Sequence, residues 1–213
     1  MDGKILKNES MFFLVNNQIV LLEVLRMKVQ PITDVKHIKK IKRLLSNKPR
    51  DLLLFIMGIN SGLRVQDLLT LKVADVQSAK AGDRIVVVEK KTGKPNIIII
   101  NDEILVYLSA YLQSIPDSKA TDYLFKSRKG ANYPLNTLSV THMVKEWCQH
   151  IKLEGNFGAH TLRKTFCYMQ RTLYGTSWEV LCRRLNHSSP AITMRYLGVR
   201  PEEVENILSN TIG

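Results

Sequence analysis

The chain of 213 residues is long enough for one sizeable domain, and its 45% content of hydrophobic residues excludes wholesale disorder. Lys and Arg total 31 against 19 Asp and Glu, which gives a formal net charge of +12. Such an excess of positive charge favours a polyanionic partner, with nucleic acid first and an acidic membrane surface second.

The three cysteines are Cys148, Cys167 and Cys182, an odd number at wide spacing. The sequence has no Cys-x-x-Cys and no Cys/His ligand spacing, which argues against both a disulfide framework and a zinc knuckle. We expect reduced, partly buried thiols in a cytoplasmic protein.

The candidate targeting segment is MFFLVNNQIVLLEVL, at residues 11–25. Asn16, Asn17 and Gln18 interrupt its apolar run, and the run is too short to span a bilayer. We therefore expect no membrane partner. Residues 1–30 are interpreted as an apolar arm or extension, ahead of a domain at residues 31–213 that includes the tail at 198–213.

The first half of the chain predicts helices followed by one hairpin. A cap at Thr33 or Asp34 opens an amphipathic helix whose outer face is basic. A buried helix then opens at Pro49 and stops at Asn-Ser-Gly, and LRVQDLLTL begins another at once. Residues 84–100, RIVVVEKKTGKPNIIII, are two β-branched runs around a Gly-Pro turn, which predicts an antiparallel hairpin.

Helical patterns dominate from residue 101 onward. One helix has an Asn/Asp cap, another follows a proline, and AHTLRKTFCYMQRTLYG ends in glycine. The next opens with the capping box Thr176-x-x-Glu179, and another begins with a Ser cap and Pro190 and ends at Gly198. PEEVENILSN predicts a final acidic helix. The expected fold class is α+β, mainly α, with one small antiparallel sheet.

Two helix starts place cationic side chains where an anion can bind. Arg64 directly follows a Ser-Gly break, beside free backbone N–H groups, and Asp67 one turn on can hold its guanidinium. His160 and Arg163 lie three residues apart, on one face of the first turn of another helix.

Two further segments carry a lysine cluster and a candidate nucleophile. Lys90, Lys91 and Lys94 occupy the hairpin tip, where they can reach over a site or simply protect an edge strand from aggregation. His187 precedes the last well-capped helix, and Tyr196 lies in that helix's last turn. Because the free pKa of tyrosine is near 10, a nucleophilic Tyr196 needs help from imidazoles or nearby positive charge.

Each segment alone is compatible with a structural role, but their order along the chain is distinctive. SGLRVQDLLTLKVADV, KKTGK, GAHTLRKTF and LNHSSPAITMRYLG together resemble the tyrosine recombinase (phage integrase) family over roughly residues 31 to 200. The resemblance implies the tyrosine recombinase catalytic-domain fold and a site-specific DNA recombinase of the integrase or invertase type. It implies catalytic roles for Arg64, Lys91, His160, Arg163, His187 and Tyr196.

The implied reaction is transesterification of a DNA phosphodiester. The hydroxyl of Tyr196 attacks phosphorus, forming a 3′-phosphotyrosyl enzyme and a free 5′-hydroxyl without ATP. Arg64 and Arg163 grip non-bridging oxygens, and His160 and His187 hydrogen-bond the phosphate.

A hairpin lysine protonates the leaving oxygen in this scheme. Lys91 matches the family position best, while Lys90 and Lys94 stay open because the hairpin register is not set by sequence. The sequence shows no carboxylate cluster with metal-ligand spacing, so we expect no cofactor and cleavage without a metal.

The expected partner is double-stranded DNA, bound with an affinity that falls steeply with salt. The resemblance also implies self-association into a dimer or tetramer on DNA, accessory DNA-bending proteins and a cytoplasmic, nucleoid-associated location. With about thirty residues ahead of the catalytic domain, the chain resembles compact, catalytic-domain-only members such as the small invertases, or a remnant that has lost its DNA-binding domain, which another chain would then supply. The tail after Tyr196 docks on a neighbouring subunit or packs on its own domain.

Two other functions remain open at this point. One is type IB topoisomerase-like DNA relaxation, which uses the same catalytic groups in a monomer. The other is a non-catalytic DNA-binding regulator that retained the fold. The small size and the tail favour a recombinase over a topoisomerase, and the full set of catalytic residue types favours an enzyme over a regulator.

Overall fold

A computed structural model describes residues 29–198 and residue 211. The proposed arm, apart from its last two residues, and the predicted acidic helix after Gly198 lie outside these residues, so both stay predictions. Among the residues described, the helices are too short or too polar to traverse a membrane.

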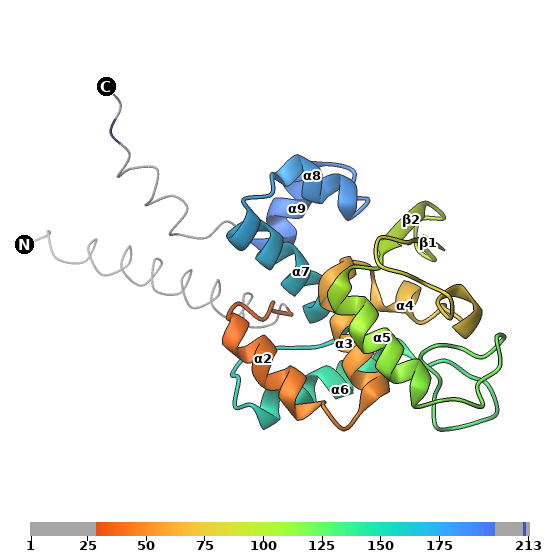
Figure 1. Cartoon of the computed structure of the whole chain (residues 1–213). Helices are drawn as coiled ribbons and strands as arrows, with labels where there is room; N and C mark the ends of the chain where they lie inside the picture. Colours follow the sequence, from red (N-terminus) through yellow and green to blue (C-terminus); the bar gives the residue numbers. More distant parts are fainter. Residues whose placement is uncertain (1–28, 199–210, 212–213) are drawn as a thin grey trace, which may run out of the picture.

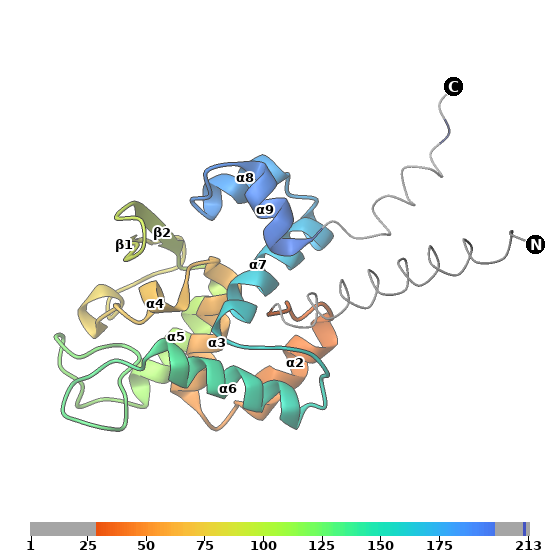
Figure 2. The same cartoon turned by 180° about the vertical axis from the view of Figure 1, so that it is seen from behind.

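The core is built around helix α3 (Pro49–Ser61), whose residues 52–58 are all buried. A helix that is apolar on every side must be enclosed by other elements. Helices α5 (Asp102–Gln113) and α7 (Ala159–Tyr174) pack directly on α3. Helices α2 (Val35–Leu44) and α6 (Thr137–His150) complete the surrounding layer, as Figures 1 and 2 show.

Side-chain caps begin helices α2, α5 and α8 (Trp178–Arg184), with one correction to the prediction, whereas the predicted cap Ser189 of α9 (Pro190–Leu197) makes no side-chain capping bond. Asp34 caps α2 by accepting from the backbone N–H of Lys36 at 2.7 Å, and Asn101 caps α5 in the same way. Helix α8 begins one residue later than the predicted capping box requires. Its N-cap is Ser177, whose hydroxyl accepts from the N–H of Val180, so the prediction of Thr176 as cap is wrong.

The predicted hairpin consists of β1 (Arg84–Val88) and β2 (Pro95–Ile99), paired antiparallel with Val86 opposite Ile97. The turn is longer than the predicted Gly-Pro turn, because it runs from residue 89 to residue 94 and Pro95 already pairs with Val88. Two backbone bonds between Glu89 and the far side of the turn close it.

A second, smaller apolar cluster joins the end of the chain to α7. Phe166, Cys167 and Leu185 form it, and Tyr196 and Leu197 of α9 pack against it. In both views the α8–α9 pair and the hairpin occupy the same end of the molecule. The expected fold class, mainly helical with a small two-stranded antiparallel sheet, is confirmed. The three cysteines are buried and unpaired, as predicted.

Gly62 ends α3 and sets the direction of the turn that carries Arg64. Its φ is +65°, and a Cβ added there would lie 2.4 Å from Cδ1 of Phe166. We expect Gly62→Ala to lower the free energy of unfolding by about 2–5 kcal/mol, from left-handed strain of about 1–2 kcal/mol plus overpacking of about 1–3 kcal/mol.

Gly175 is the matched control for this substitution. It ends α7 at φ +62°, and a Cβ there would meet nothing within 4 Å. Gly175→Ala should therefore cost only the strain, about 1–2 kcal/mol. Urea unfolding of both variants makes the comparison. Equal losses would contradict the tight contact with Phe166.

Candidate active site

Arg64 is the N-cap residue of a short helix, α4 (Val65–Leu68), directly after the Gly62 turn. Val65, Leu68 and Leu69 of this segment are buried. The prediction that Asp67 holds the guanidinium of Arg64 is wrong. Arg64 Nη1 instead lies 2.6 Å from Oε2 of Glu89 in the hairpin. Asp67 is fully buried and uses Oδ1 to accept from the backbone N–H of Lys90 at 2.9 Å, so its carboxylate faces the hairpin backbone.

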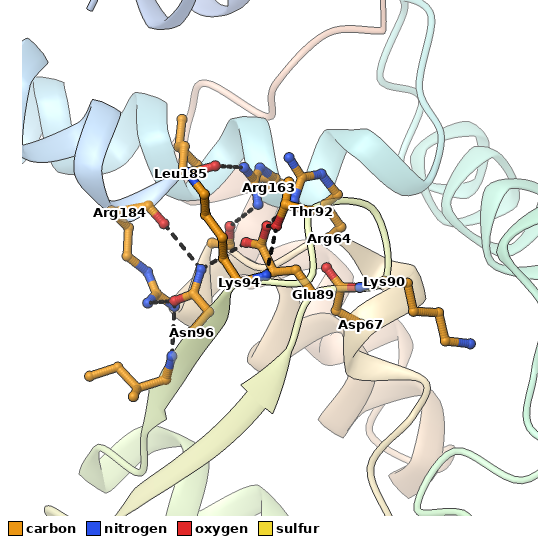
Figure 3. A network of polar contacts seen from close by, with 12 residues as sticks. Arg64, Asp67, Glu89, Lys90, Thr92, Lys94, Asn96, Arg163, Arg184 and Leu185 are labelled. Carbon is orange, nitrogen blue, oxygen red and sulfur yellow. Dashed lines mark hydrogen bonds and ion pairs between the residues drawn. The ribbon is translucent and has the colours of Figure 1, made fainter. Parts of the chain in front are cut away.

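Arg163 is a buried residue of α7, with only 2% of its surface exposed, and it joins two other segments of the chain. Its Nη1 donates to the carbonyl of Gly62 at 3.0 Å, and its Nη2 donates to the carbonyl of Leu185 at 2.6 Å. The guanidinium groups of Arg163 and Arg64 lie next to each other in Figure 3. Burial and then the charge of Arg64 lower the pKa of Arg163. The structure thus brings together the two arginines that the resemblance pairs.

His160 and Lys91 approach this pair from two different elements. His160 lies in the first turn of α7, as predicted. Desolvation lowers its pKa, and the charges of Arg163, Arg64 and Lys91 lower it further. Lys91 is exposed in the hairpin turn, and its charge also acts on His187. Lys90 extends away from the arginines in Figure 3. Lys91 stays the predicted hairpin lysine of this site, and Lys94 stays the alternative.

His187 and Tyr196 meet edge to face beside the arginines. Their ring centroids are 5.6 Å apart at an interplanar angle of 76°. His187 Nδ1 lies 2.9 Å from Oγ1 of Thr193, a contact that fixes the orientation of the imidazole. Lys164 Nζ lies 4.9 Å above the centre of the Tyr196 ring, where a cation is attracted by the ring face.

The Tyr196 hydroxyl is buried, and within the described part of the chain it makes no hydrogen bond of normal geometry, although the Arg163 guanidinium lies near enough to interact with it and lower its pKa. Burial raises its pKa, although the nearby charges of Arg163 and Arg64 act in the opposite direction. Desolvation outweighs the neighbouring positive charge here, so Tyr196 keeps its proton and needs a base to lose it, in line with the expectation that it requires help.

Three polar residues of this region are absent from the sequence-based prediction. Glu89 is fully buried and holds Arg64, while Asn96 and Arg184 form the next layer of contacts behind it. The strand alternation that buries Ile85 and Val87 also buries Glu89. A carboxylate at the inward position of a strand was the signal available in the sequence.

The pKa of His187 gives a testable property of the site. Burial, then the charges of Arg163 and Arg64, lower it from 6.5 to about 4. As the pH falls, His187 is protonated in the unfolded chain before it is protonated in the folded protein. The stability contributed by neutral His187 is therefore complete above pH 6.5 and is lost as the pH falls toward 4. We expect the imidazole resonances of His187 to titrate near pH 4 in the free protein. Bound DNA should raise that midpoint, because phosphate charge offsets the arginines.

Nuclear magnetic resonance with a His187→Asn variant, for assignment, measures this midpoint. A midpoint near 6.5 in the free protein would contradict the burial of His187 beside the two arginines.

Among the described residues, no three His, Cys, Asp or Glu side chains lie together as a metal ion would require.

Comparison with known proteins agrees with this arrangement. The model of the phage integrase family matches residues 29–203. The chain is 41% identical over 174 residues to the probable integrase/recombinase YoeC of Bacillus subtilis (strain 168), an alignment that covers 80% of this chain and 90% of YoeC.

Solved structures show the same fold. The crystal structure of XerA recombinase matches with a TM-score of 0.70 at 22% identity, over 85% of this chain and 65% of XerA. XerH site-specific recombinase, bound to its palindromic difH substrate after cleavage, matches with a TM-score of 0.68 at 20% identity, over 84% of this chain and 52% of XerH. This chain thus spans about half to two thirds of those two recombinases. The family match and the similarity to YoeC show that the chain belongs to the phage integrase family, the tyrosine recombinases.

Proposed function

We propose that the protein is a site-specific DNA recombinase that cuts and rejoins DNA through a covalent 3′-phosphotyrosyl intermediate. The observation that carries this proposal is the convergence of two guanidinium groups and a tyrosine hydroxyl from three separate segments. Arg64, Arg163 and Tyr196 come from α4, α7 and α9, and the charges of both arginines act on the tyrosine.

The two arginines supply the charge that a pentacoordinate phosphorus requires. Negative charge grows on the non-bridging oxygens as Tyr196 attacks, and donors already held in place stabilise it without reorganisation. Arg163 is held by two carbonyls and Arg64 by Glu89, so both guanidinium groups are oriented before DNA arrives. We infer that these fixed cations take the part a metal ion has in other phosphoryl-transfer enzymes. The ester energy is kept in the phosphotyrosine, so resealing needs no ATP.

Proton transfer falls to the histidines and the hairpin lysine. Because its pKa is raised, Tyr196 starts protonated and must lose its proton during the attack. His160 has a lowered pKa and is therefore neutral at physiological pH, which leaves it able to accept a proton. We propose the tautomer in which Nδ1 of His187 accepts from the hydroxyl of Thr193, so that Nε2 carries the proton and donates it to a phosphate oxygen. Lys91 protonates the leaving 5′-oxygen.

Double-stranded DNA is the proposed partner. XerH is bound to its difH substrate in a similar fold, and the net charge of this chain is +12. We propose that the protein associates into a dimer or tetramer on DNA, and that accessory DNA-bending proteins and a location at the nucleoid go with this activity.

The test is to find which DNA becomes covalently attached to the protein in its host cell. The protein is recovered under denaturing conditions, and the attached DNA is sequenced. Attachment through the DNA 3′ end leaves the DNA resistant to a 3′→5′ exonuclease and sensitive to a 5′→3′ exonuclease. Attachment through the 5′ end, or no attached DNA, would overturn the proposal.

The mapped site then separates the alternative functions. A plasmid that carries two copies of this site should yield exchanged products with the purified protein. Relaxation of the plasmid without exchange would instead identify a topoisomerase-like enzyme. If the host cell yields no covalently attached DNA but the purified protein still retains DNA on a native gel, the protein is a DNA-binding regulator.

A further inference from the structure

Glu89 is a fully buried carboxylate at the base of the hairpin turn, and both of its oxygens are occupied. Its Oε2 accepts from Nη1 of Arg64 at 2.6 Å and from the hydroxyl of Thr92 at 2.8 Å. Its Oε1 accepts from Nδ2 of Asn96 at 2.9 Å. These contacts join the Arg64 turn to both strands of the hairpin, as Figure 3 shows.

Glu89 remains ionised in this environment. Burial by itself would raise the pKa of its carboxyl group, but the hydrogen bonds from Asn96, Thr92 and Arg64, together with the charge of Arg64, lower it to about 2. At neutral pH the side chain is therefore a fixed negative charge in contact with Arg64.

A second layer of contacts holds this carboxylate from behind. Asn96 Oδ1 accepts from Nη1 of Arg184 at 2.5 Å, and Arg184 Nε donates to the carbonyl of Ser61 at 2.8 Å. Ser61 is the last residue of α3, three residues before Arg64. The contacts therefore run from Arg64 through Glu89, Asn96 and Arg184 back to the turn that carries Arg64.

The backbone of Glu89 also defines the turn that carries Lys91. Its N–H donates to the carbonyl of Lys94 at 3.0 Å, and its carbonyl accepts from the N–H of Gly93 at 2.8 Å. One residue thus contacts the Arg64 guanidinium with its side chain and closes the Lys91 turn with its backbone.

A stability role alone does not account for this arrangement. A buried ion pair often contributes no more stability than apolar side chains of the same volume, because both charges lose their hydration. It does, however, restrict the orientation of a planar guanidinium strongly. Orientation is what a catalytic arginine needs before a phosphate arrives.

We propose that Glu89 is a positioning residue of the active site, which holds the Arg64 guanidinium in the orientation that binds the reacting phosphate. This inference rests on the proposed recombinase function. Asn96 and Arg184 support Glu89 in this role and keep the hairpin aligned with the α8–α9 segment.

The experiment compares Glu89→Gln with Glu103→Gln. Glu103 is the control because, in the described part of the chain, it makes no hydrogen bond or ion pair with Arg64, yet it also pairs with a cation, Lys42, and accepts from a side-chain amide, Asn60 Nδ2, at 2.9 Å. The readouts are the single-turnover rate of covalent adduct formation on a nicked substrate with the mapped site, and DNA affinity at the same salt concentration.

We expect Glu89→Gln to slow adduct formation roughly ten- to a hundred-fold, as when a supporting residue is removed from a ligating group. DNA affinity should be unchanged or tighter, since binding depends on many phosphate contacts. Glu103→Gln should react at the wild-type rate.

A double-mutant cycle distinguishes positioning from a general structural effect. If Glu89 acts through Arg64, the further loss caused by Glu89→Gln in an Arg64→Lys background should be much smaller than in the wild type. Equal losses in both backgrounds, or a wild-type rate for Glu89→Gln, would overturn the proposal. Where Glu89→Gln does not fold, Thr92→Val removes one bond to the same Oε2 atom, and a wild-type rate for that variant would overturn it too. If the wild-type chain itself forms no adduct, the proposed function fails, and not only the role of Glu89.

Discussion

Tyr196→Phe is expected to abolish covalent attachment to DNA while leaving the fold and DNA retention intact. The phenyl ring keeps the contacts with Phe166, Cys167 and Leu185 but has no oxygen to attack phosphorus. The change also removes a buried hydroxyl that lacks a hydrogen bond of normal geometry in the described part of the chain. The free energy of unfolding should therefore stay the same or rise by about 1–3 kcal/mol. Denaturing gels of the protein with a nicked substrate measure the adduct, and urea unfolding measures the stability.

Tyr174→Phe is the control for this substitution. Tyr174 ends α7 and is 73% exposed, so neither adduct formation nor stability should change. An adduct that persists in Tyr196→Phe would place the nucleophile on another residue. A clear loss of stability in that variant would mean that the hydroxyl has a partner that stabilises the fold.

Arg163→Ala is expected to have the largest effect on stability in the site. It would leave the carbonyls of Gly62 and Leu185 without the donors that now satisfy them. Each unsatisfied buried group costs about 1–3 kcal/mol, so the free energy of unfolding should fall by about 2–6 kcal/mol. Arg183→Ala is the control, because Arg183 lies exposed on α8 and its loss should change stability by no more than about 0.5 kcal/mol.

Arg163→Lys tests the catalytic part of the same residue. A lysine keeps the positive charge but cannot donate to two carbonyls and a phosphate with one planar group. At a temperature where the variant stays folded, we expect adduct formation to slow by about a hundred- to a thousand-fold. A variant that reacts at the wild-type rate would show that charge alone is sufficient at this position. If Arg163→Ala is as stable as the wild type, the hydrogen bonds by which Arg163 joins the end of α3 to the α8–α9 segment do not stabilise the fold.

The secondary structure around the site was predictable because its causes are local. The cap at Asp34, the glycine that ends α3 and the proline that opens α9 each act within one turn of the chain. The one misplaced cap, Thr176 for Ser177, is an error of a single residue between two hydroxyl side chains. Helix boundaries are uncertain at this scale in any sequence.

The partner of Arg64 was predicted wrongly for the opposite reason. Asp67 lies three residues from Arg64, so the helical neighbour rule favoured it. Glu89 lies 25 residues away and reaches Arg64 only because the hairpin folds over the α4 turn. Asp67 is drawn instead to a backbone N–H of the same hairpin.

The sequence by itself determined the helical architecture with its one hairpin, because helices and hairpins depend on neighbours within a few positions. It also determined the family and the residue types that a phosphate site needs, because these follow from a distinctive order of short motifs. Only the tertiary structure decided that Glu89 holds Arg64, that the charge of Lys91 acts on both histidines, and that the Tyr196 hydroxyl is buried with a raised pKa. Burial and charge contacts depend on which distant segments pack together. Desolvation, which dominates the pKa shifts of both His187 and Tyr196, has no counterpart in local sequence.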